Sequence, residues 1–117
     1  MFLLYLSSAI FVVAAAYGFG PFTALVKKQP AKMRSVWIHG GLALLAAALM
    51  IYGAVKTPGD IPFLAIIGMI ITVMAGLMLF ALRRANAYFP TWAALLHPLI
   101  GILSLISLFM FLFGSRT

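Results

Sequence analysis

Two histidines, His39 and His97, are the side chains with the widest chemistry in this 117-residue chain. An imidazole can move a proton near neutral pH, or bind a transition metal through one ring nitrogen. The other reactive groups are few, because Asp60 is the single side-chain carboxylate and the chain has no cysteine. With no paired carboxylates, no serine–histidine–carboxylate set and no phosphate-binding glycine loop, the sequence argues against hydrolysis and phosphoryl transfer.

Long apolar runs surround both histidines. The chain is 66% hydrophobic and 8% charged, whereas soluble domains are about half apolar and about a quarter charged. Four runs, at about residues 2–26, 36–55, 61–82 and 92–113, each hold the roughly 20 residues that a helix needs to cross hydrocarbon. The sequence therefore predicts an all-α integral membrane up-down four-helix bundle, as a single transmembrane domain over residues 1–117.

Charges between the runs predict the orientation in the membrane. Loop 27–35 carries four basic residues, loop 83–91 carries two, and residues 56–60 have no net charge. By the positive-inside rule, both basic loops are cytoplasmic and both termini lie outside, as expected for a bacterial inner (plasma) membrane. The net charge of +7 lies between apolar runs rather than on a polar face, so we expect lipid and no nucleic acid as partner.

A weak internal repeat relates the two halves of the chain. Residues 24–28 resemble residues 81–84, and in each half a tryptophan and then a histidine follow: Trp37 and His39, then Trp92 and His97. The pattern suggests two duplicated helical hairpins related by an axis along the membrane normal. Chance similarity between apolar segments is the alternative, and the unequal tryptophan-to-histidine spacing favours it.

Both histidines are expected near the cytoplasmic side, at depths that differ by only a few ångströms, counting about 1.5 Å per residue from the helix starts. Haem b held by two imidazoles requires such matched ligands, with small residues beside them to admit a flat ring. Cationic side chains at the same membrane face can pair with the haem propionates. The sequence predicts metal ligation by His39 and His97. The expected cofactor-binding neighbours are Gly40, Gly41, Ala94, Gly101, Lys28, Arg34, Arg83 and Arg84.

The two histidines and the four-helix outline resemble small membrane cytochromes b of the cytochrome b561 kind, in which histidines on transmembrane helices hold haem. The resemblance implies a redox protein that exchanges electrons with a quinone or with another membrane protein. Those proteins commonly hold two haems through four histidines. This chain has two histidines, so it can hold at most one bis-histidine haem.

Other interpretations remain open at this stage. Each histidine can simply pack, hydrogen-bonded to a backbone carbonyl, such as the one that Pro98 frees one turn before it. A proton relay or a quinone site is a further use of paired histidines. Small-residue stripes such as Gly68, Thr72, Ala75 and Gly76 can build the bundle, a homo-oligomer, or a contact of a non-catalytic subunit or assembly factor with a larger membrane complex. A small transporter is also conceivable, although Asp60 is expected in a loop.

Overall fold

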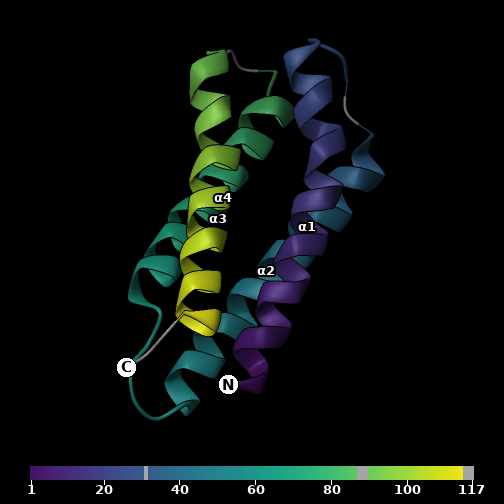
Figure 1. The fold of residues 1–117 in the computed structure, drawn as a ribbon. Coiled ribbons are helices and arrows are strands. Elements are labelled where there is room, and N and C mark those ends of the chain that lie inside the picture. The colour runs from purple at the N-terminus through teal and green to yellow at the C-terminus, as the bar shows by residue number, and fades with distance from the viewer. Residues whose placement is uncertain (31, 87–89, 115–117) are drawn as a thin grey trace. The chain divides into compact units, whose positions relative to one another are not determined.

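The described part of the computed structural model, residues 1–30, 32–86 and 90–114, is all-α. Its helices are α1 (Phe2–Val26), α2 (Met33–Lys56), α3 (Phe63–Arg84) and α4 (Thr91–Phe113) (Figure 1). All four are long and apolar enough to span a membrane, which confirms the predicted class of an all-α integral membrane protein. Helix α3 starts two residues later than predicted because Pro62, which has no N–H group, takes the capping position before its first turn.

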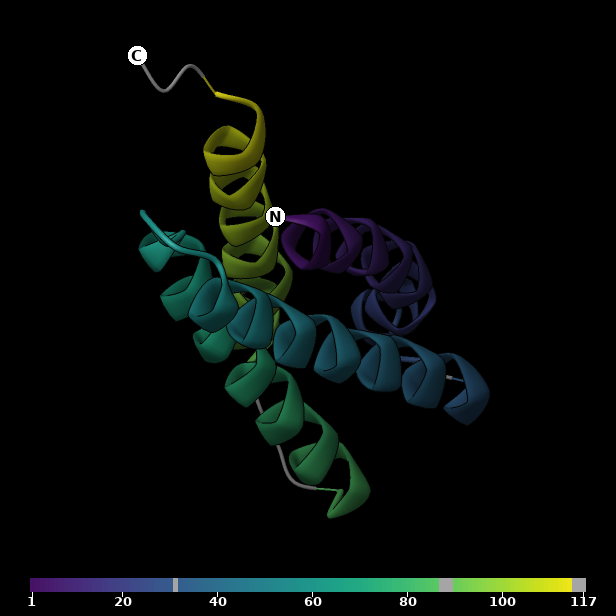
Figure 2. The same ribbon diagram turned by 90° about the horizontal axis from the view of Figure 1, so that it is seen from below.

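The chain divides into two compact units, Met1–Pro58 and Gly59–Thr117, and each unit is a helical hairpin. Helix α1 packs along α2 in the first hairpin, and α3 packs along α4 in the second. The partners run antiparallel to each other (Figure 1), and Figure 2 shows the same helices from below. The prediction that short connections pair consecutive helices is confirmed within each hairpin.

Around the turn that connects their two helices, the hairpins repeat the same backbone structure at one offset along the chain. Helices α1 and α3 end at Val26 and Arg84, and each is followed by a residue with positive φ, 55° at Lys28 and 53° at Asn86. A residue in the left-handed conformation just after a helix ends that helix, because the chain turns there and the last carbonyls of the helix accept local hydrogen bonds. The following helices begin at Met33 and Thr91. These two starts are separated by the same number of residues as the two helix ends, Val26 and Arg84.

This offset corrects the register of the predicted repeat. Residues 24–28 are equivalent to residues 82–86 rather than to 81–84, and Trp37 is equivalent to Leu95 rather than to Trp92. The two histidines are equivalent, since the same offset separates His39 from His97. The histidines, and not the tryptophans, therefore mark corresponding places in the two hairpins.

The buried positions follow the same offset. Six pairs are buried in both hairpins: Leu4 and Pro62, Ser7 and Ala65, Phe11 and Met69, Ala46 and Ser104, Met50 and Leu108, Ala54 and Leu112. In the first hairpin the Ser7 hydroxyl donates to the Ala46 carbonyl across a distance of 2.8 Å. In the second hairpin the buried serine is on the second helix rather than on the first. Ser104 occupies the position equivalent to Ala46 and packs on Gly68. Small residues thus allow close helix contact in both hairpins, by different side chains.

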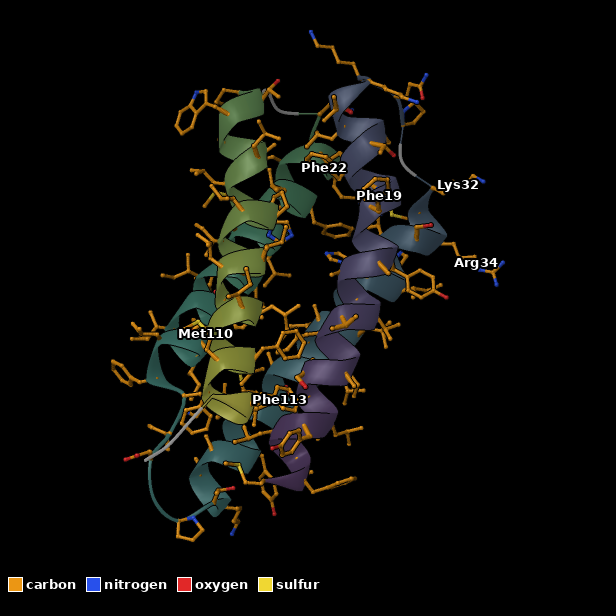
Figure 3. All side chains as sticks on the ribbon, viewed as in Figure 1. Phe19, Phe22, Lys32, Arg34, Met110 and Phe113 are labelled. Carbon is orange, nitrogen blue, oxygen red and sulfur yellow. The ribbon has the colours of Figure 1, made fainter. Side chains whose placement is uncertain are left out.

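The outward faces of the helices are apolar. Phe19, Met110 and Phe113, which are labelled in Figure 3, have exposed fractions of 70%, 69% and 67%. Large exposed apolar side chains occur on all four helices, which is unusual for a soluble monomer and normal for helices that face lipid. These faces are therefore consistent with a lipid bilayer as their environment.

Candidate functional site

His39 is hydrogen-bonded to the neighbouring helix of its own hairpin. It is half-buried, six residues after the start of α2, and its Nδ1 lies 2.7 Å from the carbonyl oxygen of Ala14 on α1. A carbonyl oxygen can only accept, so Nδ1 carries the proton and donates. In the neutral ring, Nε2 is then the nitrogen with the lone pair, which is the form that binds a metal.

His97 has the same arrangement in the second hairpin. It is half-buried, six residues after the start of α4, and its Nδ1 lies 2.9 Å from the carbonyl oxygen of Thr72 on α3. Donor and acceptor are 25 residues apart in both hairpins. The hydrogen bond to a carbonyl that the packing interpretation predicts is therefore present. Its acceptor belongs to the adjacent helix rather than to the turn before Pro98.

A glycine lies under each imidazole. A Cβ atom added to Gly18 would stand 2.8 Å from both Nδ1 and Cε1 of His39. A Cβ atom added to Gly76 would stand 2.8 Å from Cε1 and 3.4 Å from Nδ1 of His97. Each ring thus lies directly on the backbone of the helix that accepts its hydrogen bond. Gly18 and Gly76 are separated by the same number of residues as His39 and His97. This equal spacing is the sequence signal that connects the two glycines to the two histidines.

The small residues predicted beside the histidines fall into two groups. At Gly40 and Gly41 on α2, an added Cβ atom would meet no other group within 4 Å, so these positions do not serve contact with α1. Ala94 is buried, and Gly101 packs on the Thr72 side chain, where an added Cβ atom would lie 3.1 Å from Cγ2. Ala94 and Gly101 therefore bring α4 close to α3.

The predicted basic residues lie at the ends of the hairpins where the histidines are found. Lys28 and Arg34 are exposed, and Figure 3 shows Arg34 and Lys32 extending outward at the start of α2. Arg83 and Arg84 form the end of α3, with the Arg84 guanidinium 5.9 Å from the centre of the Phe80 ring. Both histidines are about 9 Å along their helices from these ends, at 1.5 Å per residue. The predicted loops 27–35 and 83–91 include residues 31 and 87–89, which lie outside the described residues.

A haem would require fewer protein ligands than a bare metal ion. Among the residues that the structure describes, no three His, Cys or Asp/Glu side chains are close enough together to hold an ion. A porphyrin supplies four iron ligands itself and requires only axial ligands from the protein. An imidazole whose Nδ1 proton is held by a carbonyl meets that requirement.

The fold and these sites define a membrane protein of two structurally repeated helical hairpins, each with a histidine hydrogen-bonded across its two helices. No family model matches the sequence, and neither a curated protein nor a solved structure matches it. The functional assignment therefore depends on the geometry of the two histidines.

Proposed function

We propose that this chain is a haem b-binding membrane protein and that His39 and His97 would hold the iron. The observation that carries the proposal is the pair of hydrogen bonds from Nδ1 to the carbonyls of Ala14 and Thr72. Histidines that bind metals almost always donate their other ring N–H to a carbonyl, carboxylate or water, which fixes the tautomer and makes the ligand more basic.

The choice of residue type supports a role beyond packing. Ser7 makes the same kind of bond between α1 and α2, to the Ala46 carbonyl, with a much smaller side chain. An imidazole within a membrane span is costlier than a hydroxyl, and ionisable groups at such places are usually functional. Few helical residues are identical at the offset that relates the hairpins: Leu6 and Leu64, Gly18 and Gly76, Phe22 and Phe80, His39 and His97, Leu45 and Leu103. Histidine is therefore the only ionisable residue among these identical pairs of helical residues.

Other residues have supporting roles in this proposal. Gly40 and Gly41 leave the surface of α2 next to His39 free of side chains, which suits the approach of a flat ring. Lys28, Arg34, Arg83 and Arg84 pair with the propionates at the membrane face. Ala94 and Gly101 hold α4 against α3 and so fix the helix that carries His97.

Bound haem supplies one-electron redox chemistry. Ligation of the iron by both imidazoles would favour electron transfer over reactions that require substrate on the iron. The protein would exchange electrons with a quinone or with a second membrane protein, and its own residues bind and orient the cofactor.

The absorption spectrum of the purified protein tests this proposal. A chain expressed with adequate haem supply and purified in mild detergent is expected to show a Soret band and, after dithionite, a sharp α-band. Extraction into alkaline pyridine should give one haem b per chain, because two histidines suffice for one site. A protein that shows no haem bands and takes up no added haemin would contradict the proposal.

We further propose that the basic connections face the cytoplasm of a bacterial inner membrane and that both termini lie outside. The cysteine-free sequence allows single cysteines to report this directly. A membrane-impermeant maleimide is expected to label Asp60→Cys in intact cells, and Lys28→Cys only after the membrane is opened, because positive loops are retained inside. The unsubstituted chain is the blank, and the reverse pattern would show that the orientation is wrong.

A further inference from the structure

Gly18 and Gly76 lie directly against the imidazoles of His39 and His97, the proposed iron ligands. Each lies one turn after the residue whose carbonyl accepts the Nδ1 proton: Gly18 follows Ala14, and Gly76 follows Thr72. The imidazole therefore lies across one turn of the neighbouring helix, with its nitrogen on the carbonyl and its ring edge on the glycine. The same arrangement occurs in both hairpins.

Glycine within a helix requires an explanation, because it costs roughly 0.5–1 kcal/mol relative to alanine. At Gly20 and Gly40, an added Cβ atom would meet no other group within 4 Å, so no contact explains glycine there. At Gly18 and Gly76 the added atom would stand 2.8 Å from a ring atom, which is too close for any real side chain. Glycine at these two positions is explained by the imidazole that lies on it.

The group that would have to move is the end of a side chain. A histidine can turn about two side-chain torsions, so a methyl group at position 18 or 76 would push the ring aside rather than force the helices apart. The hydrogen bond from Nδ1 would then lengthen or break. The two sites differ in degree, because the added atom at Gly18 would approach Nδ1 itself to 2.8 Å, whereas the one at Gly76 would approach Nδ1 to 3.4 Å.

We propose that Gly18 and Gly76 are positioning residues that hold His39 and His97 in the Nδ1–H tautomer with Nε2 as the metal-binding nitrogen. This inference rests on the proposed haem function, because the expected effect is a loss of haem affinity. The positions of the glycines and the imidazoles that support it are those of the chain without haem. Loss of a hydrogen-bonding partner behind a metal-binding histidine typically lowers metal affinity by about 10–100-fold. We expect a loss of haem affinity in that range for Gly18→Ala and a smaller loss for Gly76→Ala.

The primary test reads the histidine tautomers without haem. Nitrogen-15 NMR of the full-length, haem-free protein, labelled at histidine, should show Nδ1 protonated in both rings. In Gly18→Ala the His39 signals should change to the other tautomer or to a mixture, while the His97 signals stay as they were. Gly76→Ala should change the His97 signals alone, and to a lesser extent. Gly20→Ala, on the same helix as Gly18, is the matched control and should change neither ring.

The outcomes separate this inference from the proposed function. Unchanged His39 signals in a folded Gly18→Ala chain would overturn the positioning role, whatever the haem spectrum shows. A wild-type chain without haem bands would contradict the haem proposal, while the tautomer signals would still decide what the glycines do. Haem titration of the same variants then provides the second readout, in which weaker binding with unchanged helix content by circular dichroism supports the inference.

Discussion

Loss of the bis-imidazole spectrum is the expected result of replacing either His39 or His97 by alanine. With one of the two proposed ligands missing, the haem would be held more weakly, so the sharp α-band should disappear. Haem affinity should fall by more than the roughly 10–100-fold that follows loss of a mere hydrogen-bonding partner. Because the two histidines occupy equivalent positions, His39→Ala and His97→Ala should have similar effects. Absorption spectra and haem content of the purified variants measure both quantities.

Ser7→Ala is the matched control for the histidine variants. It removes another hydrogen bond between α1 and α2, from the Ser7 hydroxyl to the Ala46 carbonyl, and leaves both histidines in place. Such a bond contributes about 0.5–1.5 kcal/mol to stability, so the variant should be slightly less stable and keep its spectrum. If Ser7→Ala lost haem as the histidine variants do, the histidines would be acting through hairpin stability. If the histidine variants kept the α-band, the ligands would be other groups.

Gly68→Ala is expected to have the largest effect on the stability of the second hairpin. A methyl group at this position would run into the Ser104 hydroxyl and stand 3.0 Å from its Cβ and 3.7 Å from its Cα. Atoms so close to the backbone of α4 cannot turn aside as an imidazole can, so the helices must separate. Overpacking of this kind costs about 1–3 kcal/mol. Reversible unfolding of the protein in mixed detergent micelles, followed by circular dichroism, measures the loss.

The first hairpin suggests how Gly68→Ala can be rescued. Its equivalent of Ser104 is Ala46, and its equivalent of Gly68 is Ile10, so a smaller residue on the second helix accompanies a larger one on the first. Adding Ser104→Ala to Gly68→Ala removes the hydroxyl, which is the closest of these contacts, and leaves the contact with Cβ. It should therefore restore part of the lost stability. Gly40→Ala, where the new methyl group would meet nothing within 4 Å, should be close to neutral. A double variant as unstable as Gly68→Ala alone would show that the contact with the Ser104 hydroxyl is not the cause.

The sequence predicts the helices well, because length and hydropathy alone decide which segments can cross a membrane. The predicted boundaries differ from the structure by three residues at most, and the start of α2 at Met33 rather than at residue 36 is the largest difference. Charged residues such as Arg34 are accommodated in the first turn of α2, where their long side chains reach the polar interface. A count of apolar residues therefore places the start of this helix too late.

The register of the repeat could not be read from the sequence in the same way. Apolar segments match one another at several offsets, and the basic ends of residues 24–28 and 81–84 favoured a pairing two residues away from the structural one. The backbone turn at Lys28 and Asn86 fixes the offset, and unlike side chains there conceal it. Aligning the chain on His39 and His97 would have given the correct offset and paired Gly18 with Gly76.

The contact between Gly18 and His39 depends on helix packing and has no local sequence signature. The two residues lie on different helices, and which faces meet is set by the close approach of α1 and α2. Small residues were expected to face either a cofactor or a neighbouring helix. The structure shows which of them contact a helix of their own hairpin and which do not. Gly68 and Gly76 on the predicted stripe pack on α4, whereas Gly40 and Gly41 make no such contact.

The short connection from Thr57 to Pro62 matters for the proposed haem site. A single hairpin carries one histidine, so two separate hairpins could hold one iron together only as far as their concentration allows. If both histidines hold one iron as proposed, this connection would make the second ligation intramolecular, with an effective concentration in the millimolar range for short linkers. Ligation by both histidines would then be independent of how much protein the membrane contains.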